Sequence, residues 1–97
     1  MTDRLAGMLG LCRRARKLLS GTVAVEKALS AGQAFLVLAD ENMAEGSREK
    51  LIRLCGRSAA ELRMLPGGYL ETVLGEARMC ACVTDAGFTQ SILKLMN

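Results

Sequence analysis

The segment that most constrains the fold runs from residue 18 to residue 32, where a short apolar stretch, a glycine, a helical pattern and a second glycine follow one another. Gly21 can adopt backbone torsions that other residues resist, so it permits a sharp turn out of a strand. Thr22 is placed to cap the helix that follows, and Gly32 stands where a left-handed C-terminal cap is expected. One face of this helix is expected to pack on a sheet, and it carries Val25, Ala28, Leu29 and Gly32.

The start of this helix is a candidate binding surface for an anion. A helix that begins directly after a glycine presents unpaired backbone N–H groups and the positive end of its dipole. Both features suit a phosphate group, and Lys27, a turn and a half into the helix, adds a mobile cation nearby. An ordinary strand-to-helix corner with an exposed lysine explains the same residues, so these residues alone leave both interpretations open.

Length and hydrophobicity favour a single domain, residues 1–97. Of the 97 residues, 51% are hydrophobic, which is enough for one packed core. No apolar run approaches the roughly 20 residues that span a bilayer. The N-terminal segment has no secretory pattern, so we expect a cytoplasmic protein without a membrane partner.

Positive charge is concentrated in the first third of the chain. Residues 1–32 carry six Lys or Arg and two Asp or Glu, whereas residues 33–97 carry seven and eight. Clustered cations raise the local electrostatic potential and favour a polyanionic partner, although a solvated face would have the same composition. The cluster consists of Arg13, Arg14, Arg16 and Lys17.

Catalytic and metal-binding signals are scarce. The chain has no His, which removes the commonest general base, and it has neither a Walker A motif nor a GxGxxG motif after a strand. Its four cysteines stand in apolar patterns typical of buried thiols, and their spacing does not suit a zinc site. We therefore expect no enzyme activity, no metal and no cofactor. The cysteines are Cys12, Cys55, Cys80 and Cys82.

The remaining pattern predicts a first helix, up to about residue 17, and then four repeats of strand and helix. Such alternation is typical of helices on both faces of a small, largely parallel sheet. After the first strand and helix, the expected elements are a buried strand at 34–39, a helix at 43–55 stopped by Gly56, an edge strand at 61–65, a turn at 66–68, a short helix at 69–74, a buried strand at 79–83 and a last helix capped by Thr84 and Asp85.

Three smaller features bear on function. Gly7 and Gly10 share a helical face that either admits another backbone or lines a solvent face. The polar residues 40–42 follow a buried strand, where they either form a binding group or cap the next helix. Phe35 and Phe88 are expected in the core, which disfavours stacking of single-stranded bases on an aromatic platform.

Several segments of the chain resemble the ribosomal protein L-seven-Ae and L-thirty-e superfamily. They follow one another in the order and at the spacing of that family, over nearly the whole chain. They are Leu18–Gly21, Lys27–Ala34, Leu36–Asp40, Gly75 with Arg78, and Val83–Phe88. The run from Leu9 to Gly21, taken with Val83–Phe88, is most similar to the small bacterial branch. The resemblance implies an α/β fold, a three-layer α/β/α sandwich with a four-stranded mixed sheet.

The resemblance also implies binding of RNA, typically of kink-turns. In the family, the loop and helix start after the first strand carry Gly-x-Asn-Glu-x-x-Lys; the Asn and Glu read sheared G·A pairs and the Lys approaches the backbone. Gly21 and Lys27 match this pattern, whereas Val23 and Ala24 stand at the Asn and Glu positions. These departures predict weaker reading of base edges with backbone contacts kept. The family's second contact region is the loop before the last strand, which ends here with Arg78.

The leading hypothesis is a non-catalytic protein that binds a structured, kink-turn-like or ribosomal RNA, with the ribosome as a candidate partner. Gly21, Thr22 and Lys27 would contact the RNA backbone, and Arg78 would contact its second side. The basic cluster at residues 13–17 would supply positive potential.

The alternative is a protein-interaction module on the same fold that has lost specific RNA reading. In that case Val23 and Ala24 would form an apolar contact patch. A thiol-dependent enzyme is a third and distant hypothesis, because it would require a reactive cysteine.

Overall fold

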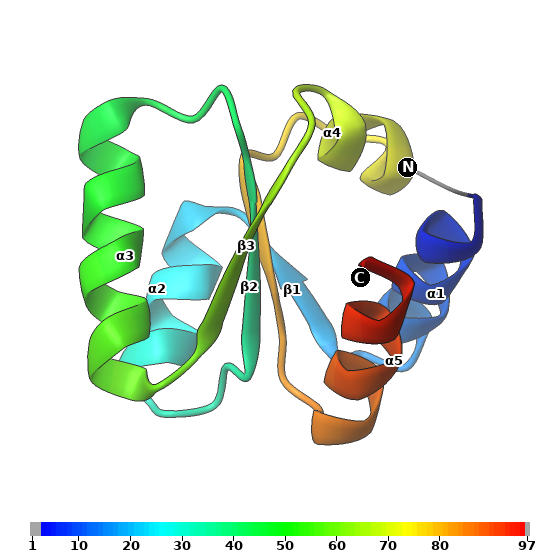
Figure 1. Cartoon of the computed structure of the whole chain (residues 1–97), viewed down its shortest axis with the longest axis horizontal. Coiled ribbons are helices and arrows are strands. Elements are labelled where there is room, and N and C mark those ends of the chain that lie inside the picture. The colour runs from blue at the N-terminus through cyan, green and yellow to red at the C-terminus, as the bar shows by residue number, and fades with distance from the viewer. Residues whose placement is uncertain (1–2, 97) are drawn as a thin grey trace.

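A four-stranded sheet lies between two layers of helices in the computed structural model, which describes residues 3–96 (Figure 1). The order of elements confirms the predicted alternation of strands and helices. The elements are α1 (Asp3–Arg14), β1 (Leu18–Ser20), α2 (Thr22–Ser30), β2 (Leu36–Asp40), α3 (Glu45–Ser58), β3 (Glu61–Leu65), α4 (Tyr69–Leu74), β4 (Cys80–Val83) and α5 (Ala86–Met96).

The sheet is mixed, with the strand order β1-β4-β2-β3. β2 and β3 are parallel, whereas β4 lies antiparallel to both of its neighbours, β1 and β2. The prediction of a largely parallel sheet is therefore wrong, and the mixed sheet implied by the resemblance is confirmed. The reason is the length of α4: its six residues span only about 9 Å. Because α4 is too short to carry the chain back along the sheet, β4 starts at the end where β3 stops.

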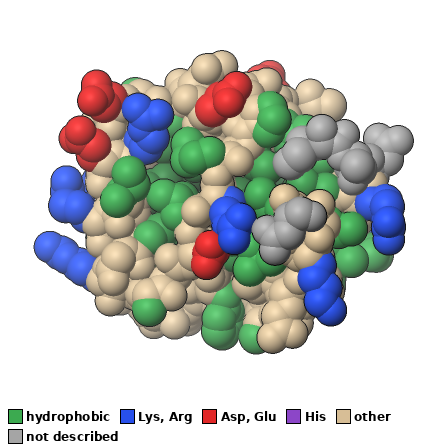
Figure 2. Space-filling view, in the orientation of Figure 1, with side chains coloured by type: hydrophobic (Ala, Val, Ile, Leu, Met, Phe, Trp, Pro, Cys, Tyr) green, Lys and Arg blue, Asp and Glu red, His purple; other side chains and the backbone are tan. Residues whose placement is uncertain are grey.

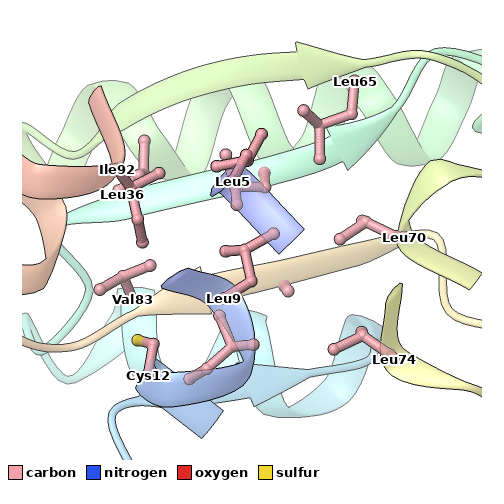
Figure 3. Packing of buried hydrophobic residues seen from close by; sticks show 12 residues of the cluster. Leu5, Leu9, Cys12, Leu36, Leu65, Leu70, Leu74, Val83 and Ile92 are labelled. Atoms are coloured by element: carbon pink, nitrogen blue, oxygen red, sulfur yellow. The ribbon is translucent and has the colours of Figure 1, made fainter. Parts of the chain in front are cut away.

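Each face of the sheet is covered by its own helices, with α1, α4 and α5 on one side and α2 and α3 on the other (Figure 1). Two hydrophobic clusters fill the space between the sheet and the helices: the first lies under α1, α4 and α5, and the second lies under α2 and α3. Alternate residues of β2 point to opposite faces, so Leu36 and Leu38 belong to the first cluster, whereas Val37 and Ala39 belong to the second. All residues of β2 and β4 are buried, as their continuous apolar runs predict. Helix side chains of the first cluster, seen in Figure 3, include Leu5, Leu9, Cys12, Leu70, Leu74 and Ile92.

Four helices end in left-handed residues. Gly32 has φ of 69°, and the N–H of Gln33 donates to the carbonyl of Ala28 at 2.9 Å, which confirms the predicted C-terminal cap of α2. Gly32 itself is exposed, so its predicted packing on the sheet is wrong. α1 ends at Arg14 rather than near residue 17, because Arg16 adopts φ of 62° and takes the place that glycine usually holds.

Gly56 does not stop the third helix, contrary to the prediction. α3 continues to Ser58 and ends at Ala59, whose φ is 57°. Glycine inside a helix costs only about 1 kcal/mol relative to alanine, and Leu51 and Cys55 are buried against the sheet in the same helix. Burial of one helical face therefore outweighs the weak helix propensity of glycine.

Several local predictions are confirmed. β3 lies at the edge of the sheet, and α4 has the predicted bounds. The Asp85 carboxylate accepts a hydrogen bond from the N–H of Phe88 at 2.8 Å and so caps α5. Phe88 packs partly buried against the first cluster, but Phe35 precedes β2 and is 48% exposed, so its predicted core position is wrong.

The polar residues at the end of β2 stabilise a turn. Asp40 is buried, and its two carboxylate oxygens accept hydrogen bonds from the N–H groups of Asn42 at 2.7 Å and Gly68 at 2.8 Å. The Glu41 carboxylate accepts from the N–H of Gly67 at 3.0 Å. The N-cap of α3 is Ala44, without a side-chain bond. Residues 40–42 therefore connect β2 to the turn before α4 and do not cap a helix.

Candidate nucleic-acid interface

Gly21 joins β1 to α2 in a conformation that requires glycine. Its φ of 95° and ψ of 150° lie in a region that side-chain-bearing residues rarely enter. Its N–H donates to the carbonyl of Cys80 at 2.9 Å and extends the β1–β4 ladder by one residue. Its carbonyl accepts from the N–H of Val25 at 3.0 Å and begins the helix. Gly21 is thus the N-cap of α2.

Thr22 is the first helical residue, so the prediction that it caps α2 is wrong. Its side chain instead hydrogen-bonds Cys80. Burial raises the pKa of the Cys80 thiol, and this hydrogen bond offsets part of the rise. Because Gly21 is the N-cap, the first-turn N–H groups have no capping side chain. The positive end of α2 therefore faces outward without an internal acidic partner in its first turn.

A surface hollow of about 430 Å³ lies at this helix start. It is lined by the segment from Ser20 to Ala24 together with Lys27 and Arg78. Val23 is 69% exposed, and Lys27 is exposed. The fold thus brings Gly21, Thr22, Val23, Ala24, Lys27 and Arg78, six of the predicted site residues, to one place.

Arg78 lies directly over Gly21. A Cβ atom at position 21 would stand 3.5 Å from an Nη atom of Arg78 and 3.8 Å from its Cδ and Cζ. The loop before β4 and the turn after β1 therefore meet in space, as antiparallel pairing of these strands requires. These Cβ distances are ordinary van der Waals distances, so a side chain at position 21 would touch Arg78 without displacing it.

Arg13 is linked to Arg78 by ion pairs that both make with one acidic residue. One oxygen of Glu76 is 3.1 Å from an Nη atom of Arg13, and the other is 3.6 Å from an Nη atom of Arg78. Arg13 also donates to the carbonyl of Leu74 at 2.7 Å. The sequence did not indicate this bridging role of Glu76. The only sequence signal for it is an acidic residue in an otherwise basic candidate site.

Arg14, Arg16 and Lys17 are not brought to the hollow. The carbonyl of Lys17 accepts the N–H of Thr84 at 2.9 Å, which places Lys17 beyond the opposite end of β1 from Gly21. The three residues of β1 separate these ends by about 10 Å. On the face shown in Figure 2, the described Lys and Arg side chains are likewise spread apart. Within residues 3–96, Arg13 is therefore the member of the basic cluster that is linked to the residues of the hollow.

Gly7 and Gly10 line a solvent face. Neither has an atom from elsewhere in the described residues within 4 Å of the position where a Cβ would stand. The close approach of another segment within the chain, which the sequence left open, does not occur at these glycines in the part of the chain that the structure describes.

All four cysteines are free and buried, as their apolar patterns predict. Burial raises the pKa of Cys12 and of Cys82 to about 11, and it raises the pKa of Cys55 and Cys80 as well. These thiols are therefore protonated at neutral pH and poor nucleophiles. Within residues 3–96, no group of three or more His, Cys, Asp or Glu side chains is placed to hold a metal ion. No helix of that range is long and apolar enough to cross a membrane.

Fold and site together define an α/β/α sandwich with a partly basic hollow at an exposed strand-to-helix turn. No family model matches the chain. It is 32% identical over 95 residues to the RNA-binding protein YlxQ of Bacillus subtilis (strain 168), an alignment that covers 93% of this chain and 92% of that protein. The chain belongs to the same family as YlxQ.

A solved structure supports the same fold. A protein from Bacillus halodurans C, described as of unknown function, superposes with a TM-score of 0.89 at 30% sequence identity. The match covers 98% of each chain. The whole α/β/α arrangement is therefore shared with that protein.

Proposed function

We propose that the chain, as one domain, is a non-catalytic RNA-binding protein and that its RNA contact surface is the hollow between the start of α2 and Arg78. The position of Arg78 beside Gly21 carries this proposal, because both residues line one hollow and two distant segments thus form one surface with cationic and backbone N–H groups. The relationship to YlxQ, which is named as an RNA-binding protein, supports the choice of ligand.

The preferred RNA in this proposal is folded and kink-turn-like, as in the L-seven-Ae and L-thirty-e superfamily. Val23 and Ala24 have no hydrogen-bonding side-chain groups to read base edges. Each missing contact of this kind removes about 1–3 kcal/mol of discrimination between bases. Recognition would therefore depend on the shape and phosphates of the RNA, which a helix start and nearby cations can contact. We propose that the chain acts in the cytoplasm, with ribosomal RNA as one candidate ligand.

The test is a titration of a kink-turn RNA and a straight duplex of equal length at two salt concentrations. We expect tighter binding of the kinked RNA, with a preference that survives the higher salt. Lys27→Gln and Arg78→Gln should weaken binding to both RNAs. Lys94→Gln is the matched control, because Lys94 is exposed in the last turn of α5, outside the hollow.

Two results would contradict the proposal. Equal, weak binding of both RNAs, lost together with rising salt, would show charge attraction without recognition of shape. Unchanged affinity in both variants would place the contact surface elsewhere. Co-sedimentation of the chain with ribosomes, with and without prior digestion of the RNA, tests the ribosomal partner separately.

A protein-interaction module is the second candidate, and the exposure of Val23 favours it. This side chain is 69% exposed at the edge of the hollow. An apolar contact there releases few counterions, so its affinity would change little with salt, unlike that of a phosphate contact. Val23→Ser would then weaken partner binding and leave RNA affinity unchanged.

A further inference from the structure

The charge network around Glu76 is asymmetric. Its contact with Arg13 is short, 3.1 Å, and Arg13 is also anchored by a 2.7 Å hydrogen bond to the carbonyl of Leu74 at the end of α4. Its contact with Arg78 is longer, 3.6 Å, and Arg78 has no second ion pair among the described residues. Arg78 is therefore the side chain that can leave the network most easily.

Arg78 is also the member of the network that lines the hollow. Its guanidinium group lies above Gly21, within reach of the start of α2, and its side chain is 44% exposed. An exposed ion pair of this kind is weak. A phosphate that contacts Arg78 in the hollow must share or replace the Glu76 carboxylate, because both are anions that need the same guanidinium group.

We infer that Glu76 is a built-in competitor that lowers the affinity of Arg78 for RNA phosphate, and that Arg13 moderates this competition by drawing the carboxylate toward itself. The inference rests on the proposed function of the hollow. Arg13 is then a positioning residue that acts through Glu76. Without Arg13, the carboxylate would keep Arg78 as its one ion-pair partner in the described part of the chain.

The first experiment measures binding of the kink-turn RNA by Glu76→Gln over a range of salt concentrations. We expect about two- to fivefold tighter binding at low salt, which is the strength of one exposed ion pair. The slope of log K against log salt should steepen by about 0.7–0.9, because one more cation is free to replace counterions. Unchanged or weaker binding would overturn the inference. Weaker binding would show that Glu76 orients Arg78 instead of competing for it.

The second experiment separates the specific role of Arg13 from the general effect of removing one positive charge. Arg13→Gln and Arg14→Gln remove the same charge from neighbouring positions, but Arg14 is exposed and has no ion pair among residues 3–96. With Glu76 present, Arg13→Gln should weaken RNA binding more than Arg14→Gln does. In the Glu76→Gln background, the two substitutions should have equal effects. An excess effect of Arg13→Gln that persists there would mean a direct RNA contact and would overturn its assigned role.

The controls distinguish failure of this inference from failure of the proposed function. If Arg78→Gln weakens RNA binding but Glu76→Gln does not tighten it, only the inference fails. If the unsubstituted chain binds neither RNA, or if Arg78→Gln has no effect, the proposed function fails and the inference fails with it. Thermal unfolding of each variant confirms that the compared proteins are folded at the temperature of the titration.

Discussion

Strand β1 runs between two ends of the sheet. Both ends carry cations, but their backbone N–H and carbonyl groups have different partners. The Gly21 end comprises Gly21, Asp40, Gly68 and Arg78, and the Lys17 end comprises Arg16, Lys17, Thr84 and Asp85. At the Gly21 end, the start of α2 is uncovered and Arg78 lies beside it. At the Lys17 end, backbone and side-chain groups of Thr84 both donate to the Lys17 carbonyl, and Asp85 caps α5.

This difference shows that clustered charge in a sequence does not by itself make a binding surface. The Lys17 end has adjacent cations, yet its polar backbone groups are used to connect β1 to the start of α5. The Gly21 end has fewer adjacent cations, but it combines them with a helix start whose N–H groups can face a ligand. Four predictions test this contrast.

The largest effect is expected from Asp40→Ala at the Gly21 end. The substitution removes the acceptor for two backbone N–H groups, those of Asn42 and Gly68. Hydrogen bonds to a charged group contribute about 1.5–3 kcal/mol each, so we expect the free energy of unfolding to fall by about 3 kcal/mol. Urea denaturation measures the loss. Glu41→Ala is the control, because its exposed carboxylate accepts one bond and should cost about 1 kcal/mol or less. Equal losses would contradict the structural role of Asp40.

Gly21→Ala should have the next largest effect. The position has φ of 95° and ψ of 150°, and holding a side-chain-bearing residue there costs about 1–3 kcal/mol. The added Cβ would meet Arg78 only at ordinary contact distance, so backbone strain and not collision is the expected cause. Gly7→Ala is the matched control in open space on α1, and it should instead stabilise the chain by up to about 1 kcal/mol. Two changes of the same sign would contradict this account of Gly21.

Much of the fold follows from local patterns in the sequence. Continuous apolar runs identify the buried strands, and the Asp85 cap and the Gly32 cap each follow from residue type and position. The direction of β4 does not, because it depends on the physical length of α4 and not on the order of elements. Similarly, Arg16 and Ala59 occupy left-handed positions that their residue types do not indicate.

The candidate site was predictable only in part. The residues of the strand-to-helix turn are close in sequence, so their proximity was evident, and the resemblance placed Arg78 beside them. The division of the basic cluster depends on where α1 ends, which is set by the φ of Arg16. The Glu76 bridge depends on side chains from α1 and from the loop before β4, and no local pattern connects those segments.

Lys27→Gln and Lys17→Gln compare the two ends by RNA binding. Both substitutions remove one exposed cation. Lys27 lines the hollow, so its loss should reduce the slope of log K against log salt by about 1 and weaken binding to both RNAs several-fold. Lys17→Gln should change the slope by much less, because Lys17 lies beyond the end of β1 opposite the hollow. Equal slopes for the two variants would mean that the RNA spans both ends of β1.

The smallest effect is expected from Arg16→Gly at the Lys17 end. Arg16 has φ of 62°, a conformation that costs a side-chain-bearing residue about 1–2 kcal/mol. Glycine removes that cost but gives the unfolded chain more freedom, worth about 0.4–1 kcal/mol, so a net gain in stability of about 0.5–1 kcal/mol is expected. Ala59→Gly is the matched variant, since φ there is 57° and no charge changes. Both should raise the midpoint of urea denaturation. If Arg16 serves mainly to end α1, Arg16→Gly will leave RNA affinity close to that of Ala59→Gly. A loss as large as that of Lys27→Gln would instead assign the Lys17 end to the RNA surface.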